Sequence, residues 1–314
     1  MDQLHFDMQW PRDNLYLSCF SHEVMNYRYH WHPDEYELSI LLHGTQEFCC
    51  NTETHVFQED DIVLIDPGSG HASFSREANT CALVLHFSAD AFKQFLKKAT
   101  RFSFHNCHTT TETRDAIPYR WLRFYVAQIL DAAIQGGPYA QLTAKASMEM
   151  ILSILCRHFQ PEAVRSLPEQ NEQHARLVQR LLNYIDQHYN EKLPLEELSQ
   201  FAQYNRTYIS TLFKNTVGVN FYEYLTRVRF QNALIELATT GKNLTEIALD
   251  NGFSDLKSFN KRFRETLHRS PSEYRAQLLP GHVLGDSTRR YLTSSDVLVQ
   301  KKLKEYLNWS EERA

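Results

Sequence analysis

Residues 243–275 read NLTEIALDNGFSDLKSFNKRFRETLHRSPSEYR, and they contain the signals for two helices separated by a glycine turn. Asn243, with Glu246 three residues later, has the spacing of a capping box, in which the two residues satisfy each other's backbone amides. Gly252 can adopt the positive φ that such a turn requires. The stretch therefore predicts a helix at about 244–249, a turn, and a second helix at about 255–267, the arrangement of a helix-turn-helix.

The same arrangement is predicted earlier in the chain. A helix at about 195–202, a turn at 203–205 and a helix at about 206–217 have the length and spacing of a first helix-turn-helix. A longer helix at about 221–239 joins the two units, and Asn205 and Ser254 are the expected N-caps of the helices that follow the turns. Residues 172–276 are thus expected to form an all-helical domain with two helix-turn-helix units.

The helix expected at 255–267 divides into two faces when its residues are placed at 3.6 per turn. Apolar residues such as Phe259 and Phe263 form one stripe, and cations lie opposite. Such a surface suits phosphates and base edges of DNA; a merely solvated face is the alternative, which the repetition of the unit disfavours. The candidate DNA-contacting residues are Arg206, Thr207, Ser210, Thr211, Lys214, Lys257, Ser258, Asn260, Lys261 and Arg264.

The net charge of -5 at pH 7 conceals an uneven distribution along the chain. Lys and Arg against Asp and Glu number 13 to 21 in residues 1–171, 14 to 12 in residues 172–275, and 6 to 5 thereafter. A weakly basic domain can bind DNA when its cations share one face, because phosphates respond to local charge. The acidic front half therefore does not exclude a DNA partner.

The first half of the chain has the pattern of short strands followed by a helical hairpin. Apolar runs end at turn signals, as where residues 62–65 precede Pro67 and Gly68, which is typical of a sandwich or barrel. The predicted fold is α+β and multidomain. We expect a barrel at 1–115, a helical hairpin at 116–160, a linker at 161–171, the helical domain at 172–276 and an extension of unknown role at 277–314.

Cellular location is predicted from what the sequence lacks. No run approaches the roughly 18 apolar residues that span a bilayer, and the first residues lack the layout of a signal peptide. The six cysteines lie in the first half without a CxxC pair, so reduced thiols are expected. We therefore expect a cytoplasmic protein with no membrane partner.

Residues 172–275 resemble the DNA-binding domain of the AraC/XylS family over its whole length. The resemblance is carried by Leu195-Glu196-Glu197-Leu198, Leu212-Phe213-Lys214, Gly218, Phe221, Leu225, Arg229, Ala233, Ile247-Ala248, Gly252-Phe253-Ser254, Phe259, Phe263 and Ser270-Pro271-Ser272-Glu273-Tyr274-Arg275. It implies two recognition helices that enter successive major-groove segments, a homodimer formed through the hairpin, and contact with RNA polymerase if the protein is an activator. The family differs at Ser199, Asn205 and His268, none of which removes a DNA contact.

The front half resembles the cupin barrel. His30-Trp31-His32, Glu37 and Gly44 follow the first cupin motif, and residues 61–71 follow the second. In a metal-bearing cupin this resemblance implies that His30, His32, Glu37 and His71 hold one divalent ion. The second motif departs from the enzyme pattern, because Asp61 replaces a glycine and its histidine comes one position early.

Three occupants of the barrel follow from these residues. The first is a small-molecule effector lined by His30, Trp31, His32, Tyr36, Glu37 and His71, since ligand sites combine an apolar wall with few polar groups. The second is the divalent metal. The third hypothesis is that the barrel binds nothing, as in a constitutive activator. The leading hypothesis is a non-enzymatic, effector-controlled transcriptional regulator; the alternative is a metal-dependent cupin enzyme with a DNA-binding appendage.

Overall fold

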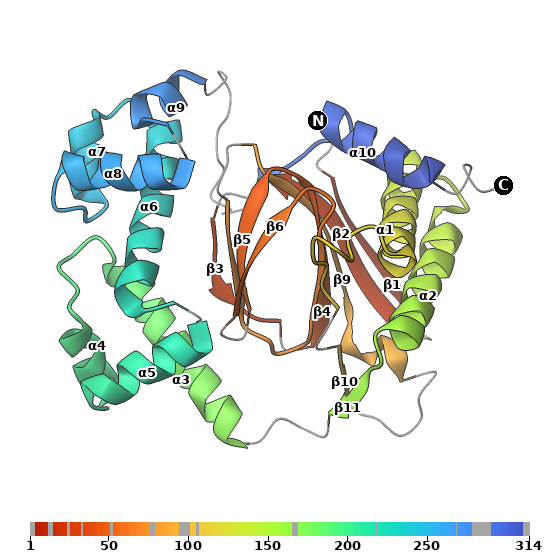
Figure 1. The fold of residues 1–314 in the computed structure, drawn as a ribbon, viewed down its shortest axis with the longest axis horizontal. Coiled ribbons are helices and arrows are strands. Elements are labelled where there is room, and N and C mark those ends of the chain that lie inside the picture. Colours follow the sequence, from red (N-terminus) through yellow and green to blue (C-terminus); the bar gives the residue numbers. More distant parts are fainter. Residues whose placement is uncertain are drawn as a thin grey trace.

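A computed structural model describes residues 4–11, 15–23, 26–32, 34–50, 53–75, 79–93, 101–104, 107–164, 169–217, 219–267, 269–277 and 290–309. Gly218 and His268, both considered in the family comparison above, lie outside these residues. The N-terminal domain contains two antiparallel sheets that face each other, and the helical domain lies beside the smaller sheet (Figure 1).

The strands of both sheets are short, and most strands that pair with each other are not consecutive in the chain. The larger has the order β1 (His5–Trp10), β2 (Leu15–Glu23), β9 (Cys81–Ser88), β4 (Glu35–His43), β7 (Ile62–Ile65), with β12 (Arg290–Tyr291) also paired to β2. The smaller has the order β3 (Asn26–His30), β8 (His71–Ser75), β5 (Thr45–Cys50), β6 (Glu53–Gln58). The hydrogen bonds between these described strands leave the two sheets separate rather than joined in one closed ring.

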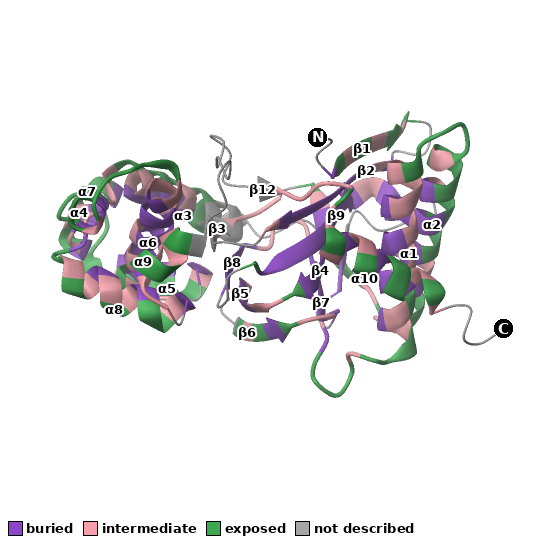
Figure 2. Cartoon of the chain, turned by 90° about the horizontal axis from the view of Figure 1, so that it is seen from above, coloured by how far each residue is buried: buried purple, intermediate pink, exposed green. Residues whose placement is uncertain are grey.

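Strand β4 shows how the larger sheet separates two environments. Leu38 and Ile40 point to a core shared with the helical hairpin, whereas Glu37 and Ser39 point to the space between the sheets. This follows from the two-residue period of a strand, which sends successive side chains to opposite faces. The domain is therefore layered, with helices on one side of the larger sheet and the smaller sheet on the other (Figure 2).

The predicted helical hairpin is formed by α1 (Ile117–Gln135) and α2 (Ala140–His158). Leu122 and Val126 of α1 and Ile151 of α2 are fully buried in the core against the larger sheet. Gly136 and Gly137 turn the chain between the helices with positive φ values of 64° and 87°. A short helix, η2 (Ala89–Phe92), and the strand pair β10 (Arg101–Ser103) and β11 (Glu162–Val164) complete this side of the domain.

Seven helices form the described C-terminal domain, close to the predicted bounds. They are α3 (Glu169–His188), α4 (Leu195–Ala202), α5 (Arg206–Val217), α6 (Phe221–Thr239), α7 (Leu244–Asp250), α8 (Leu256–Leu267) and α9 (Pro271–Gln277). Asn243 and Glu246 form the predicted capping box, and Asn205 accepts from the Tyr208 amide at 2.8 Å. The cap of α8 is Asp255 rather than Ser254, because the Asp255 carboxylate accepts from the Ser258 amide at 2.6 Å.

The ends of the helical domain differ from expectation. The segment expected as a linker, residues 161–171, contains β11, and α3 already begins at Glu169. The extension after residue 277 returns to the N-terminal domain, where β12 pairs with β2 and α10 (Val297–Asn308) packs on α1. No helix within the described residues is long and apolar enough to cross a membrane.

Candidate DNA-binding surface and ligand cavity

Helix α5 presents a polar face to solvent. Ile209 and Phe213 are fully buried in the core of the first helix-turn-helix, which turns the opposite side of the helix outward. The predicted contact residues Thr207, Ser210, Thr211 and Lys214 are all exposed there. Arg206 is also exposed, and its guanidinium lies 2.6 Å from the Glu196 carboxylate, so its charge is shared with a neighbour.

Helix α8 presents a more basic face. Phe259 and Phe263 are fully buried, and the residues on the other side are Lys257, Lys261 and Arg264, all exposed, with Ser258 and Asn260 half-buried. The Ser258 hydroxyl donates to the Asp255 carbonyl at 2.8 Å. Lys261 lies 3.8 Å from Glu265, a loose and exposed pair that contributes little and leaves the ammonium available to DNA.

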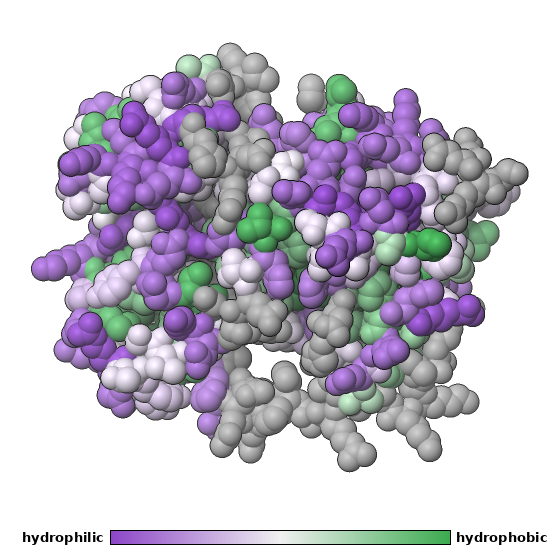
Figure 3. Space-filling view, viewed as in Figure 1, coloured by the Kyte–Doolittle hydropathy of each residue, from purple (hydrophilic) through white to green (hydrophobic). Residues whose placement is uncertain are grey.

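Helix α6 holds the two units together. Its first half contributes Tyr224 and Leu225 to the core of the first unit, and its second half contributes Phe230 and Leu234 to the core of the second. One continuous helix therefore sets the spacing between α5 and α8 (Figure 1). The surface of this domain, at the left of the view in Figure 3, is mostly hydrophilic.

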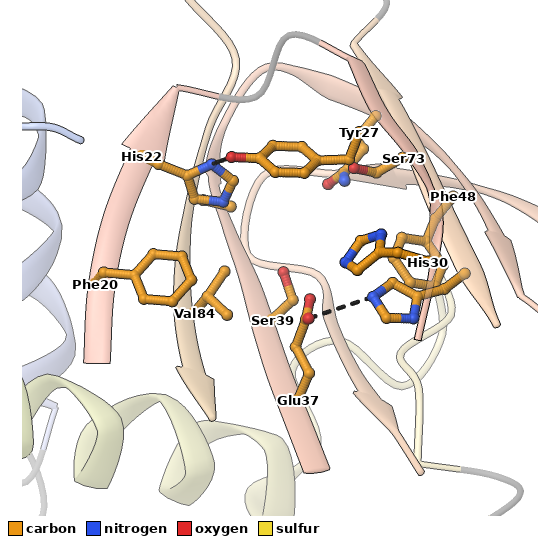
Figure 4. Close-up of a pocket in the computed structure, with 12 residues that line it drawn as sticks. Phe20, His22, Tyr27, His30, Glu37, Ser39, Phe48, Ser73 and Val84 are labelled. Atoms are coloured by element: carbon orange, nitrogen blue, oxygen red, sulfur yellow. Dashed lines mark hydrogen bonds and ion pairs between the residues drawn. The ribbon is translucent and has the colours of Figure 1, made fainter. Parts of the chain in front are cut away.

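A small cavity lies between the two sheets of the N-terminal domain. Its volume is about 20 Å³, and the predicted residues His30, Glu37 and His71 are part of its lining together with Phe20, His22, Tyr27, Ser39, Gln46, Phe48, Ser73, Ala82 and Val84 (Figure 4). A cavity of about this size accommodates one water molecule or one ion.

Glu37 is the centre of a histidine cluster beside this cavity. One Glu37 carboxylate oxygen, Oε2, lies 3.4 Å from His32 Nε2, 3.3 Å from His71 Nε2 and 3.1 Å from His86 Nε2. Burial alone raises the pKa of Glu37, but the three imidazoles outweigh it and hold the pKa well below its ordinary value. Burial lowers the pKa of His86, whereas Glu35 and Glu37 together raise it to about 9.

His86 is a site residue that the sequence analysis missed. It lies in β9 opposite Glu37 of β4. It is on the same face of β9 as Val84 and Ala82, two and four residues earlier, which line the cavity. The alternation of β9 places His86 inward once the pairing of β9 with β4 is known. The sequence offered the alternation but not the pairing.

Two of the predicted lining residues lie elsewhere. Tyr36 is on the opposite face of β4 from Glu37, where it stacks on Phe87 and its hydroxyl donates to the Phe102 carbonyl at 2.6 Å. Trp31 packs against the core cluster that includes the first helix-turn-helix. The prediction for Tyr36 is corrected by strand alternation, since adjacent residues of a strand cannot face the same cavity.

The donor set fits a divalent metal ion. His30, His32, Glu37 and His71 each offer a ligand atom within 4.8 Å of the others, and His32, Glu35 and His86 form a second such group. The Nε2 atoms of His32, His71 and His86 are buried and all approach the same Glu37 oxygen, so they converge on one point. Imidazole and carboxylate donors together suit zinc, iron, nickel and related ions.

Two helix-turn-helix units share one connecting helix and are joined to a domain with an internal cavity. The family description of an AraC-like ligand binding domain matches residues 14–113, and that of a helix-turn-helix domain matches residues 198–277. The chain belongs to the AraC family of helix-turn-helix regulators.

Curated relatives and a solved structure are similar to this chain to different extents. An uncharacterized HTH-type transcriptional regulator of Staphylococcus aureus (strain MSSA476) is 25% identical over 77% of this chain, which spans only about a third (32%) of that relative's length. The uncharacterized HTH-type transcriptional regulator YdeC of Bacillus subtilis (strain 168) is 23% identical, over 78% of this chain and 85% of YdeC. The crystal structure of ToxT from Vibrio cholerae O395 matches 85% of this chain and 99% of ToxT at 14% identity, with a TM-score of 0.37.

Proposed function

We propose that the protein is a sequence-specific transcriptional regulator that binds double-stranded DNA through α5 and α8. The observation that carries this proposal is the pair of exposed polar faces, Thr207 to Lys214 on α5 and Lys257 to Arg264 on α8, held on one connecting helix. Recognition helices of helix-turn-helix proteins read base edges in the major groove with such residues. The protein acts in the cytoplasm, is not an enzyme, and contacts RNA polymerase if it activates transcription.

Dimerisation belongs to the same proposal. The outward face of α2 exposes Leu142 and Met150, and Tyr139 precedes the helix in an exposed position. Exposed apolar side chains on one helix are suited to a contact with a second copy of the chain. We assign the homodimer contact to this face, because the inward face of α2 is already buried against α1 and the larger sheet.

Genome-wide mapping of bound DNA tests the function, followed by footprinting on a recovered site. We expect protection of two major-groove segments about one helical turn, roughly 10 base pairs, apart for each protein molecule. The genes beside the bound sites name the regulated pathway. Absence of any enriched site, or a footprint confined to a single groove segment, contradicts two-unit DNA recognition.

A divalent metal ion is the occupant of the N-terminal cavity that the geometry supports best. The cavity of about 20 Å³ is large enough for one ion or one water molecule. The buried imidazole nitrogens around Glu37 supply ligand atoms for such an ion. We propose that the ion acts as an effector of DNA binding, and that an organic effector enters only if the two sheets separate.

Replacing His71 with alanine is expected to weaken metal binding about tenfold or more, because His71 is buried and belongs to the four-residue ligand group with Glu37. The measurement is titration of metal-free full-length protein with Co²⁺, followed by its visible absorption, and with Zn²⁺, followed by elemental analysis. His43→Ala is the matched control, since His43 is exposed and pairs with Glu59 away from the cavity. If the unaltered protein binds neither ion stoichiometrically, the cavity is not a metal site.

A further inference from the structure

The smaller sheet separates the cavity from the DNA-binding domain, and its central strands face both. Phe48 of β5 and Ser73 of β8 are cross-strand neighbours that line the cavity. Glu47 and Phe74, the neighbouring pair, lie on the opposite face toward the helical domain. Since successive side chains of a strand are rigidly joined through the backbone, a shift of β5 or β8 at the cavity also moves the outer pair.

The outer face of this sheet is apolar where it meets the helical domain. Cys49, Ala72 and Phe74 belong to one continuous buried cluster with residues of α3 to α6, among them Val178 and Leu225. Strand β3 of the same sheet contacts α6 (Figure 1). The helical domain thus packs on the wall of the cavity.

Arg227 of α6 is the central polar contact of this interface. Its Nη2 donates to Glu47 at 2.8 Å, its Nε donates to Glu223 at 2.7 Å, and its guanidinium lies 3.9 Å from the centre of the Phe74 ring. Only 11% of the side chain is exposed. A guanidinium this deeply buried depends on its carboxylate partners, so the charge of Glu47 bears directly on whether the domains remain in contact.

Glu223 extends the contact to the second recognition helix. The same oxygen that accepts from Arg227 also accepts from Arg262 Nη2 of α8 at 2.9 Å. Glu47, Arg227, Glu223 and Arg262 therefore form an unbroken chain of charges, here called the interdomain relay, from the cavity wall to α8. Arg227 Nη1 and Arg262 Nε are buried and make no hydrogen bond within the described residues, so the relay is not saturated in this arrangement.

We propose that the outer face of the smaller sheet is the docking surface for the DNA-binding domain, and that the interdomain relay transmits the state of the cavity to α8. This inference rests on the proposed DNA-binding function. Two arrangements follow, one with the relay closed, as in this structure, and one in which displacement of β5 and β8 separates Glu47 from Arg227. An occupant of the cavity controls DNA binding to the extent that it prefers one of the two. Arg227 acts as a positioning residue, since its contacts lie within the protein.

The first test measures docking in the full-length protein by small-angle X-ray scattering. Glu47→Lys places a cation against Arg227 and is expected to increase the radius of gyration. Val56→Lys is the matched control, because Val56 is paired with Glu47 on the same sheet but is exposed. An unchanged radius for Glu47→Lys, or an equal increase for both variants, overturns the docking surface.

The second test measures how a change at the cavity alters the Kd for DNA. It uses a duplex that the unaltered protein selects in vitro. Ser73→Val and Phe48→Leu alter the cavity face of the sheet, and each is expected to change the Kd for this duplex about fivefold or more, the lower end of typical coupling between sites. In a Glu47→Gln background the same substitutions should change Kd less than about twofold. Two cavity variants are used so that one that fails to fold, by its circular dichroism, leaves the other.

The outcomes separate the inference from the function on which it rests. If either folded cavity variant shifts Kd equally in both backgrounds, or if folded cavity variants leave Kd unchanged, the relay does not transmit and the DNA-binding proposal stands. If the unaltered protein selects no duplex, both proposals fail, whereas the scattering comparison still decides whether Glu47 and Arg227 hold the domains together.

Discussion

Replacing Asn260 and Lys261 together with alanine is expected to weaken binding to a specific site about 30-fold or more. Each side chain lies on the outer face of α8, and loss of one good base contact costs about 1 to 3 kcal/mol. Two such losses at the lower end total about 2 kcal/mol, which corresponds to about 30-fold in Kd. Fluorescence anisotropy with the selected site and with an unrelated duplex measures the loss and its sequence dependence.

Arg264 and Lys304 provide the comparisons for this experiment. Arg264→Ala should lower the affinity for both duplexes about equally and reduce the salt dependence of binding, as expected for a phosphate contact. Lys304→Ala removes an exposed cation from α10, in the other domain, and should leave both affinities within about twofold. If the double variant binds the selected site as tightly as the unaltered protein, α8 does not enter the groove by this face.

Leu303→Ala is expected to lower the free energy of unfolding of the N-terminal domain by about 2 to 5 kcal/mol. Leu303 is 3% exposed, and with Val299 and Tyr306 it places α10 in the same core as the larger sheet and the hairpin. The helix is also held by Lys302 Nζ and the Tyr306 hydroxyl, which donate to Asp60 Oδ1 at 2.9 and 2.5 Å. Since a domain is typically stable by only 5 to 15 kcal/mol, one substitution in the extension should be plainly visible in denaturant unfolding.

Val297→Ala is the matched control on the same helix. Val297 is 83% exposed, so its replacement should change stability by less than about 0.5 kcal/mol. Equal stability of the Leu303 and Val297 variants contradicts the packing of α10 in the N-terminal core.

The helical domain was predictable because its signals are local. Capping residues such as Asn220 and Asn243 act within three residues of the helix start, and apolar stripes recur every turn. The bounds predicted for α4, α5 and α6 are confirmed. The N-cap of α8 was assigned one residue too early because Ser254 and Asp255 are adjacent and both suit the position.

The cavity was predictable only in part, because it depends on which strands pair. The resemblance to cupins selected His30, His32, Glu37 and His71; three of them line the cavity, and His32 lies beside it in contact with Glu37. His86 reaches Glu37 only through the pairing of β9 with β4, and Glu47 meets Arg227 across 180 positions of sequence. Neither contact leaves a periodic signal in the chain, so neither could be derived before the tertiary structure.

The return of the chain to the N-terminal domain after α9 has a consequence for the strength of the interdomain contact. The helical domain is an insertion, with β11 before it and β12 and α10 after it all attached to the same host. A body tethered at both ends meets its neighbour at a high effective concentration, because it cannot diffuse away. An interface that would be too weak between separate molecules is then populated most of the time, and a small change in its free energy is enough to open or close it. Because the helical domain is tethered at both ends, few contacts, such as those of Arg227, are enough to hold it reversibly against the N-terminal domain.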